Sequence, residues 1–140
     1  MAKVFTDGAC VNNGYPTARA SWACVWPDSP ELDVCGLLEG SEQTNNRAEF
    51  MAAIKALESS QGPLHIFTDS MLLLKIGQHE WQAKKNLDLV RRLNDLTRER
   101  QVKWTHVKAH TGGKDYNSVW NAVADDRAEN LIKTLNNVNE

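Results

Sequence analysis

The chain has 140 residues, of which 41% are hydrophobic and 24% charged, the balance of one globular domain rather than a disordered or fibrous protein. We therefore expect a single domain over residues 1–140, with a fraying polar tail at about 136–140. The net charge is -2, which gives no electrostatic reason to expect a nucleic-acid partner.

The sequence has no apolar run of membrane-spanning length, and no signal-peptide core follows Met1, so we expect a cytoplasmic protein. Its cysteines, Cys10, Cys24 and Cys35, form no Cys-x-x-Cys pair, and an odd number excludes a complete disulfide framework. We expect reduced, buried strand residues, because a metal or redox role would need His or Cys partners at ligand spacing.

Three short β-prone segments come first, at residues 3–7, 19–26 and 32–38, separated by Gly, Asn and Pro. Residues 45–59 then change to the helical period and end at Gln61-Gly62-Pro63. A fourth strand is predicted at residues 64–68.

The second half begins with a helix capped by Asp69-Ser70 that runs to about Ile76. A helix over 87–100, a strand over 102–107 and a closing helix over 119–135 follow. The order predicts an α/β or α+β domain with a mixed sheet covered by helices. Regular pattern is lacking only in residues 11–18, 77–86 and 109–118, and active sites favour such loops.

Two acids stand at the ends of predicted strands. Asp7 and Asp69 are each the last residue of the same tripeptide, Phe-Thr-Asp, at the end of an apolar run. If the two strands are parallel neighbours, the carboxylates lie side by side at one end of the sheet, where α/β sheets place their ligands.

A third acid, Glu49, belongs to the predicted helix over 45–59. It projects about 100° from the apolar stripe, at the boundary with solvent, and from there can reach the edge of the sheet. The alternative is a capping box in which Glu49 returns to the backbone N–H of Asn46.

The last helix offers Asp125 and Asp126. Relative to its apolar stripe, Asp125 lies about 100° away and Asp126 about 200°, nearly opposite the core. Asp126 is therefore expected to face water. Asp125 is the better ligand candidate, the alternative being a surface acid that flanks the core.

Converging carboxylates without Lys or Arg partners repel one another and favour bound cations. Oxygen ligands suit Mg²⁺ or Mn²⁺, and two such ions can activate water for phosphodiester hydrolysis. Without the four acids the rest of the chain carries +2, which weakens the objection from net charge.

Five motifs together resemble, in order, those of type 1 ribonuclease H: Thr6-Asp7-Gly8-Ala9-Cys10, Thr44-Asn45-Asn46-Arg47-Ala48-Glu49, Thr68-Asp69-Ser70, Val107-Lys108-Ala109-His110 and Trp120-Asn121-Ala122-Val123-Ala124-Asp125. The resemblance spans about residues 3–135. It implies an α/β ribonuclease H-like fold, with a five-stranded mixed sheet of three antiparallel strands, then two parallel to the first, flanked by helices.

The resemblance also implies an endonuclease that hydrolyses the RNA strand of RNA/DNA hybrids with two Mg²⁺ ions, Mn²⁺ being a substitute, and leaves 5′-phosphate and 3′-hydroxyl ends. The metal ligands would be Asp7, Glu49, Asp69 and Asp125. His110, in a loop, would assist departure of the leaving group or product; read alone, it is a solvated surface residue.

An enzyme that cuts only RNA must recognise 2′-hydroxyls in the minor groove of the hybrid. The resemblance assigns such contacts to Cys10, Asn13, Asn45 and Asn46. It assigns the DNA strand to a phosphate pocket at Thr44 and to stacking on Trp81. The two Asn residues are also good helix caps, and Trp81 is alternatively a core residue.

The chain departs from the family pattern in three places. A basic, Trp-rich protrusion is absent, because Lys84 and Lys85 are the only Lys or Arg in residues 77–86. We therefore expect low affinity for the hybrid and a steep loss of cleavage as the salt concentration rises. Met71 is also assigned to the substrate contacts, at a position where many relatives have a polar minor-groove residue. The stretch from His110 to Asp125 is longer than in the simplest members.

Other functions are also compatible with parts of this sequence pattern. A junction resolvase or exonuclease would share clustered acids without this motif set. A catalytically weak hybrid-binding module or a ribonuclease H domain of a reverse transcriptase would share the motifs. We expect a free-standing monomer whose partner is the hybrid, with no membrane and no obligate protein partner.

Overall fold

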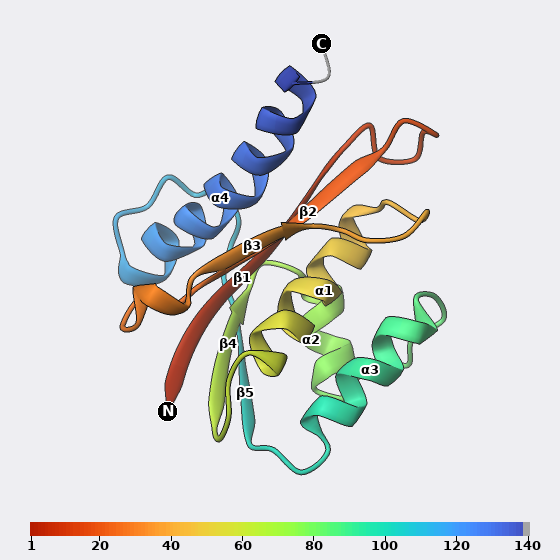
Figure 1. The fold of residues 1–140 in the computed structure, drawn as a ribbon. Coiled ribbons are helices and arrows are strands. Elements are labelled where there is room, and N and C mark those ends of the chain that lie inside the picture. The colour runs from red at the N-terminus through yellow and green to blue at the C-terminus, as the bar shows by residue number, and fades with distance from the viewer. Residues whose placement is uncertain (139–140) are drawn as a thin grey trace.

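Five strands form one mixed sheet in a computed structural model that describes residues 1–138 and the side chains of 1–134 (Figure 1). Their order across the sheet is β3-β2-β1-β4-β5. The first three strands pair antiparallel, whereas β4 and β5 run parallel to β1. The expected mixed sheet is therefore confirmed. The strands are β1 (Ala2–Val11), β2 (Arg19–Val25), β3 (Val34–Leu37), β4 (Leu64–Thr68) and β5 (Val102–His106).

Helices cover both faces of the sheet. On one face lie α1 (Asn45–Glu58), α2 (Met71–Gly77) and α3 (Leu87–Thr97), and on the other lies α4 (Tyr116–Val138) (Figure 1). A 3₁₀ turn, η1 (Pro30–Leu32), precedes β3. Each predicted strand and helix is present among the described residues. The last helix begins earlier than expected, so the end of the predicted loop over 109–118 is helical.

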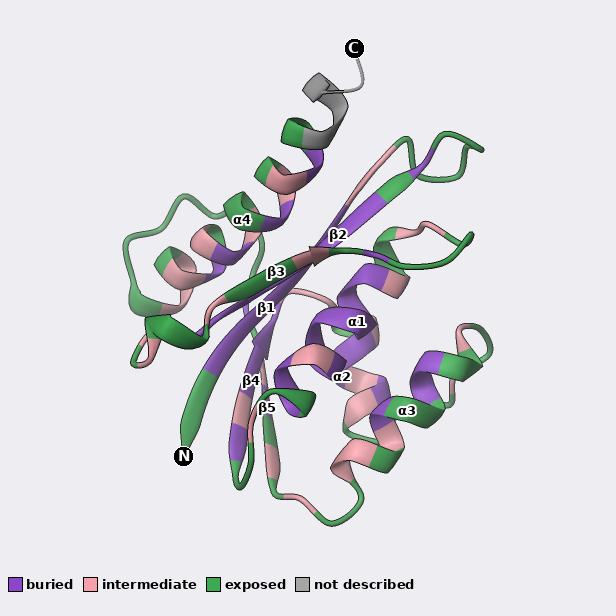
Figure 2. Cartoon of the chain, in the orientation of Figure 1, coloured by how far each residue is buried: buried purple, intermediate pink, exposed green. Residues whose placement is uncertain are grey.

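The α1 helix is buried around most of its circumference, because it lies between the sheet and α3 (Figure 2). Ala48, Ala52 and Ala56 are completely buried, and their small side chains allow close packing. The solvent-boundary position predicted for Glu49 is therefore wrong: this side chain is 3% exposed. The helical wheel assumed one apolar stripe, which a helix packed on several sides does not have.

The N-terminal end of α1 is not capped by the Asn46–Glu49 capping box that was the alternative for Glu49. Thr44 is the N-cap, and its Oγ1 accepts the backbone N–H of Arg47 at 3.1 Å. Asn46 lies inside the helix, so the capping box between Asn46 and Glu49 does not form. The Glu49 carboxylate is consequently free to point toward β1.

The strand β1 is longer than predicted, because Gly8 and the residues after it continue the strand instead of turning. It pairs with β4 only from Ala2 to Thr6 and with β2 from Phe5 to Val11. Asp7 therefore lies inside β1, not at its end. It nevertheless directly follows the last residue that pairs with β4.

All three cysteines are free, but only Cys24 is buried, whereas Cys10 is half-buried and Cys35 is exposed on the edge strand β3. The expected frayed tail overlaps α4 up to Val138, and residues 139–140 lie outside the described part. No helix within the described residues is long and apolar enough to cross a membrane.

Candidate active site

The register between β1 and β4 brings two carboxylates together. Phe5 pairs with Phe67 and Thr6 with Thr68, so the two Phe-Thr-Asp sequences run side by side in the same direction. The phenyl rings stack with centroids 4.3 Å apart, which supports this alignment. Asp7 and Asp69 are the next residues after these paired positions in the two segments, as predicted from parallel neighbouring strands.

Gly8 joins Glu49 to this pair. Its backbone N–H donates to Oδ1 of Asp7 at 3.0 Å and to Oε1 of Glu49. A Cβ at Gly8 would lie 2.6 Å from the backbone nitrogen of Glu49, so only glycine allows α1 to approach β1 this closely. Carboxylate oxygens of Asp7, Glu49 and Asp69 consequently lie within 4.8 Å of one another.

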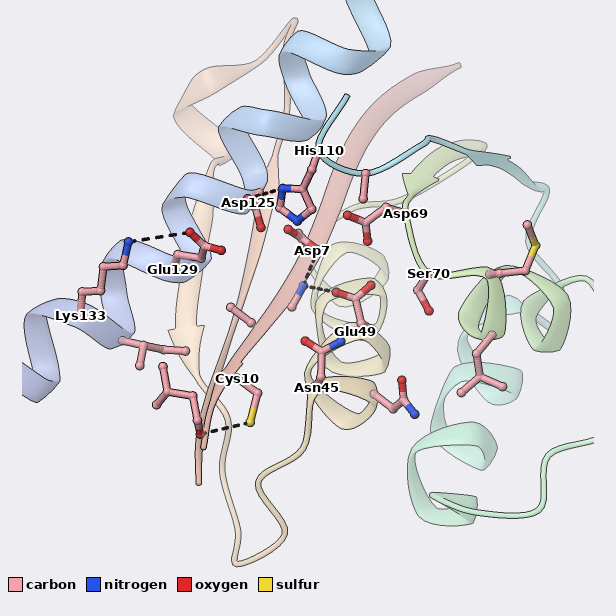
Figure 3. A pocket seen from close by; sticks show the side chains of 18 residues that line it. Asp7, Cys10, Asn45, Glu49, Asp69, Ser70, His110, Asp125, Glu129 and Lys133 are labelled. Carbon is pink, nitrogen blue, oxygen red and sulfur yellow. Dashed lines mark hydrogen bonds and ion pairs between the residues drawn. The ribbon is translucent and has the colours of Figure 1, made fainter. Parts of the chain in front are cut away.

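The α4 helix supplies the fourth acid from the opposite face of the sheet. Asp125 lines the same pocket as the three other carboxylates, and its side chain is 17% exposed (Figure 3). Asp126 is exposed, as the helical wheel predicted. His110 also lines this pocket, and its Nδ1 lies 3.7 Å from Oδ2 of Asp125.

Burial and mutual repulsion disfavour ionisation of Asp7, Glu49 and Asp69. Burial raises the pKa of Asp7, and the neighbouring charge of Glu49 raises it further. Burial likewise raises the pKa of Glu49, to about 8, and that of Asp69. Oδ2 of Asp7 and Oε2 of Glu49 are buried without a hydrogen-bond partner. Buried acceptors of this kind lack a cation or donor, so the residues fit a hard divalent ion.

Four of the predicted substrate contacts lie in the pocket with the acids. Cys10, Asn45, Asn46 and Met71 line it, and the Met71 side chain is 41% exposed. The pocket thus extends from the carboxylates along β1 and past the N-terminal end of α1.

The other predicted contacts lie outside this set. Oδ1 of Asn13 accepts the backbone N–H of Asn45 at 3.2 Å, so Asn13 braces the start of α1. The Thr44 hydroxyl is used as the cap of that helix. Trp81 lies in the connection from α2 to α3, beside a separate hollow, and is 49% exposed, which excludes the alternative of a core residue.

Sequence reasoning missed two charged residues of the pocket wall, Glu129 and Lys133. They follow Asp125 by one and two helical turns, and this spacing was the signal that could have identified them. Gly8 was noted only as part of a motif, because its close approach to α1 depends on a contact distant in sequence.

Comparison with known proteins agrees with this geometry. A family model described as RNase H matches residues 1–133. The chain is 35% identical to a ribonuclease H of Caulobacter sp. (strain K31), over 94% of this chain and 90% of that protein. It is 36% identical to a Schizosaccharomyces pombe ribonuclease H over 77% of this chain, but it spans about half of that relative, 46% of its length.

A solved structure has the same fold. The crystal structure of LC11-RNase H1 in complex with an RNA/DNA hybrid superposes with a TM-score of 0.72, covering 96% of this chain and 99% of that one. Its sequence identity is 20%, so this likeness is evidence for the fold alone.

A mixed sheet with carboxylates gathered beyond its paired parallel strands defines a ribonuclease H-like nuclease fold. The chain belongs to the ribonuclease H family. Family, fold and enzyme class are as the five motifs predicted. Members of this family act on RNA/DNA hybrids, and the acidic pocket is consistent with their active site.

Proposed function

We propose that this chain is an endonuclease that hydrolyses the RNA strand of RNA/DNA hybrids in the acidic pocket, as a monomer and with divalent metal ions. The observation that carries the proposal is the cluster of Asp7, Glu49 and Asp69, in which Asp7 and Glu49 each have a buried oxygen without a hydrogen-bond partner that a cation can bind. Asp125 completes the set from α4.

Two Mg²⁺ ions, with Mn²⁺ as a substitute, suit this all-oxygen donor set. When bound, such a pair activates a water and stabilises the leaving oxygen of a phosphodiester. The carboxylates of Asp7, Glu49, Asp69 and Asp125 would hold the ions. The Gly8 N–H orients two of these groups, since it donates to both Asp7 and Glu49.

The overall reaction requires one proton transfer on each side of the phosphorus. Water adds to phosphorus, the bond to the 3′ oxygen breaks, and the products carry a 5′-phosphate and a 3′-hydroxyl. The His110 side chain is 72% exposed beside Asp125, which supports a role in which its imidazole delivers a proton to the leaving oxygen or helps product to depart.

Selectivity for RNA would come from the same pocket. Cys10, Asn45 and Asn46 present short polar groups next to the carboxylates, where a 2′-hydroxyl of the minor groove can be recognised. Asn13 and Thr44 support this wall by holding the start of α1. Trp81 lies outside this pocket, half-exposed in the connection from α2 to α3, and we assign it to stacking against the DNA strand.

The test is a gel assay of one labelled RNA strand presented as RNA/DNA hybrid, as RNA duplex and as free RNA, with Mg²⁺ or with EDTA. We expect cleavage of the hybrid only, with Mg²⁺ only, and none by Asp69→Asn. Hybrid binding without cleavage by the wild type would favour the silent binding module instead. Equal cleavage of RNA duplex would contradict the hybrid specificity.

A further inference from the structure

The α4 helix continues the wall of the catalytic pocket beyond Asp125. Glu129, Ile132 and Lys133 also line the pocket, at four, seven and eight positions after that acid, so they share one face of the helix. Figure 3 shows Asp125, Glu129 and Lys133 in succession along α4. A rise of about 1.5 Å per residue places Lys133 about 12 Å along the helix from Asp125.

Lys133 is the only Lys or Arg among the described residues that line this pocket. The remaining charged groups are carboxylates, which repel a polyanionic substrate wherever no metal ion neutralises them. The Lys133 side chain is 67% exposed at the rim. A phosphate that enters at this end of the pocket therefore meets a single cation.

In the free protein, Glu129 is the partner of that cation. Nζ of Lys133 lies 3.9 Å from Oε2 of Glu129, one helical turn away, and the Glu129 side chain is 41% exposed. Exposed ion pairs of this kind contribute little, and this one is at the long end of the distance range. A substrate phosphate can therefore replace Glu129 at low cost.

We propose that Lys133 binds a phosphate of the hybrid more than one nucleotide from the cleaved bond, and that Glu129 competes with this phosphate for Lys133. Successive phosphates of one strand are about 3.4 Å apart along the axis, so the distance from Asp125 spans more than one nucleotide. This inference rests on the proposed function. It adds a contact that positions the hybrid and that Glu129 weakens.

The test uses the full chain with Lys133→Gln, Lys133→Arg, Glu129→Gln and, as matched control, Lys103→Gln. Lys103 is exposed on β5 and does not line the pocket. Fluorescence anisotropy in EDTA gives the Kd for a labelled hybrid at several salt concentrations, and steady-state cleavage with Mg²⁺ gives kcat and KM.

We expect Lys133→Gln to raise Kd and KM about 3- to 10-fold, to leave kcat within twofold, and to lower the salt slope of binding by about 1. Lys133→Arg should bind nearly as the wild type does. Glu129→Gln should lower Kd, because the competing carboxylate is gone.

Equal Kd values and salt slopes for Lys133→Gln and Lys103→Gln would overturn the inference. Weaker binding by Glu129→Gln would overturn the competition. If the wild type does not cleave hybrid while Lys133→Gln still raises Kd, the proposed function fails and this contact stands.

Discussion

Asp7 and Glu49 each keep one buried oxygen without a hydrogen-bond partner. Apolar or hydrogen-bonded side chains at these two positions would give a more stable fold, because burying an unpaired charge is unfavourable. These residues therefore cost the metal-free protein stability, and that cost is tied to the cation site.

The stability of the metal-free protein should depend on pH. Because burial raises the pKa of Glu49 from 4.5 to about 8, and raises that of Asp7 as well, the folded state binds more protons than the unfolded state. In EDTA, the contribution of these carboxyls to the free energy of unfolding should therefore be greatest below about pH 4.5. It should fall as pH rises toward 8, by at most about 1.4 kcal/mol per proton and pH unit. Urea unfolding at pH 5, 6, 7 and 8 measures it.

The matched control for this prediction is Glu49→Gln, which removes one titrating group at nearly constant shape. Its free energy of unfolding should depend less on pH than that of the wild type. A wild type whose metal-free stability is constant from pH 5 to 8 would show that the carboxylates do not share one buried site.

Between elements, the contact of β1 with α1 depends on Gly8. A Cβ there would meet backbone atoms, 2.6 Å from the nitrogen of Glu49 and 2.7 Å from the carbonyl carbon of Ala48. Backbone cannot move aside as a flexible side chain can, so α1 itself must shift and carry the Glu49 carboxylate away from Asp7.

We accordingly predict that Gly8→Ala lowers the free energy of unfolding by about 1–3 kcal/mol, the typical cost of overpacking, and nearly abolishes cleavage in protein that is still folded. Urea unfolding and the gel assay measure the two effects. Gly113→Ala is the stability control, because the three atoms nearest to its Cβ would be side-chain oxygens, those of Asp115, Ser118 and Thr111, rather than backbone. Full activity of Gly8→Ala would contradict this account of the β1–α1 contact.

The orientation of α4 is tested by two neighbouring acids. Asp125 lines the pocket, whereas Asp126 is exposed. Asp125→Asn should reduce cleavage severely, because a ligand charge is lost, and Asp126→Asn should stay within a few-fold of the wild type. The gel assay compares them under identical conditions, and an inactive Asp126→Asn would show that a different face of α4 meets the pocket.

At the scale of the whole molecule, cation binding links the two faces of the sheet. The proposed ligands come from β1, α1, the end of β4 and α4, so an ion bound by all of them stabilises the folded arrangement and not the unfolded chain. We predict that Mg²⁺ at about ten times its Kd raises the free energy of unfolding by about 1.4 kcal/mol. This corresponds to a Tm increase of about 3–6 °C.

Differential scanning calorimetry with and without Mg²⁺, at constant ionic strength, measures that shift. Asp7→Asn should start from a higher Tm in EDTA and gain little from Mg²⁺, because both the repulsion and a ligand are removed. An equal gain by wild type and Asp7→Asn would mean that the ion binds elsewhere.

How much was predictable differs between residues for physical reasons. The strands and helices followed from periodicity, and the pairing of Asp7 with Asp69 followed from a repeated tripeptide, since parallel strands in register bring repeated positions together. The burial of Glu49 did not follow, because a helical wheel contains no information on how many neighbours surround a helix. The length of β1 was missed because Gly8 resembles a turn residue until its close contact with α1 is known.

The sequence by itself determined the family and the order of the elements, and it predicted the four acids that line one pocket, because these depend on local patterns and on motifs that are read along the chain. Only the tertiary structure decided that the Gly8 N–H donates to two carboxylates, that Thr44 and Asn13 support α1, and that Lys133 is the one Lys or Arg among the described residues of the pocket wall. Those properties depend on which surfaces meet across the sheet. Packing between segments distant in the chain sets them, and no local pattern encodes it.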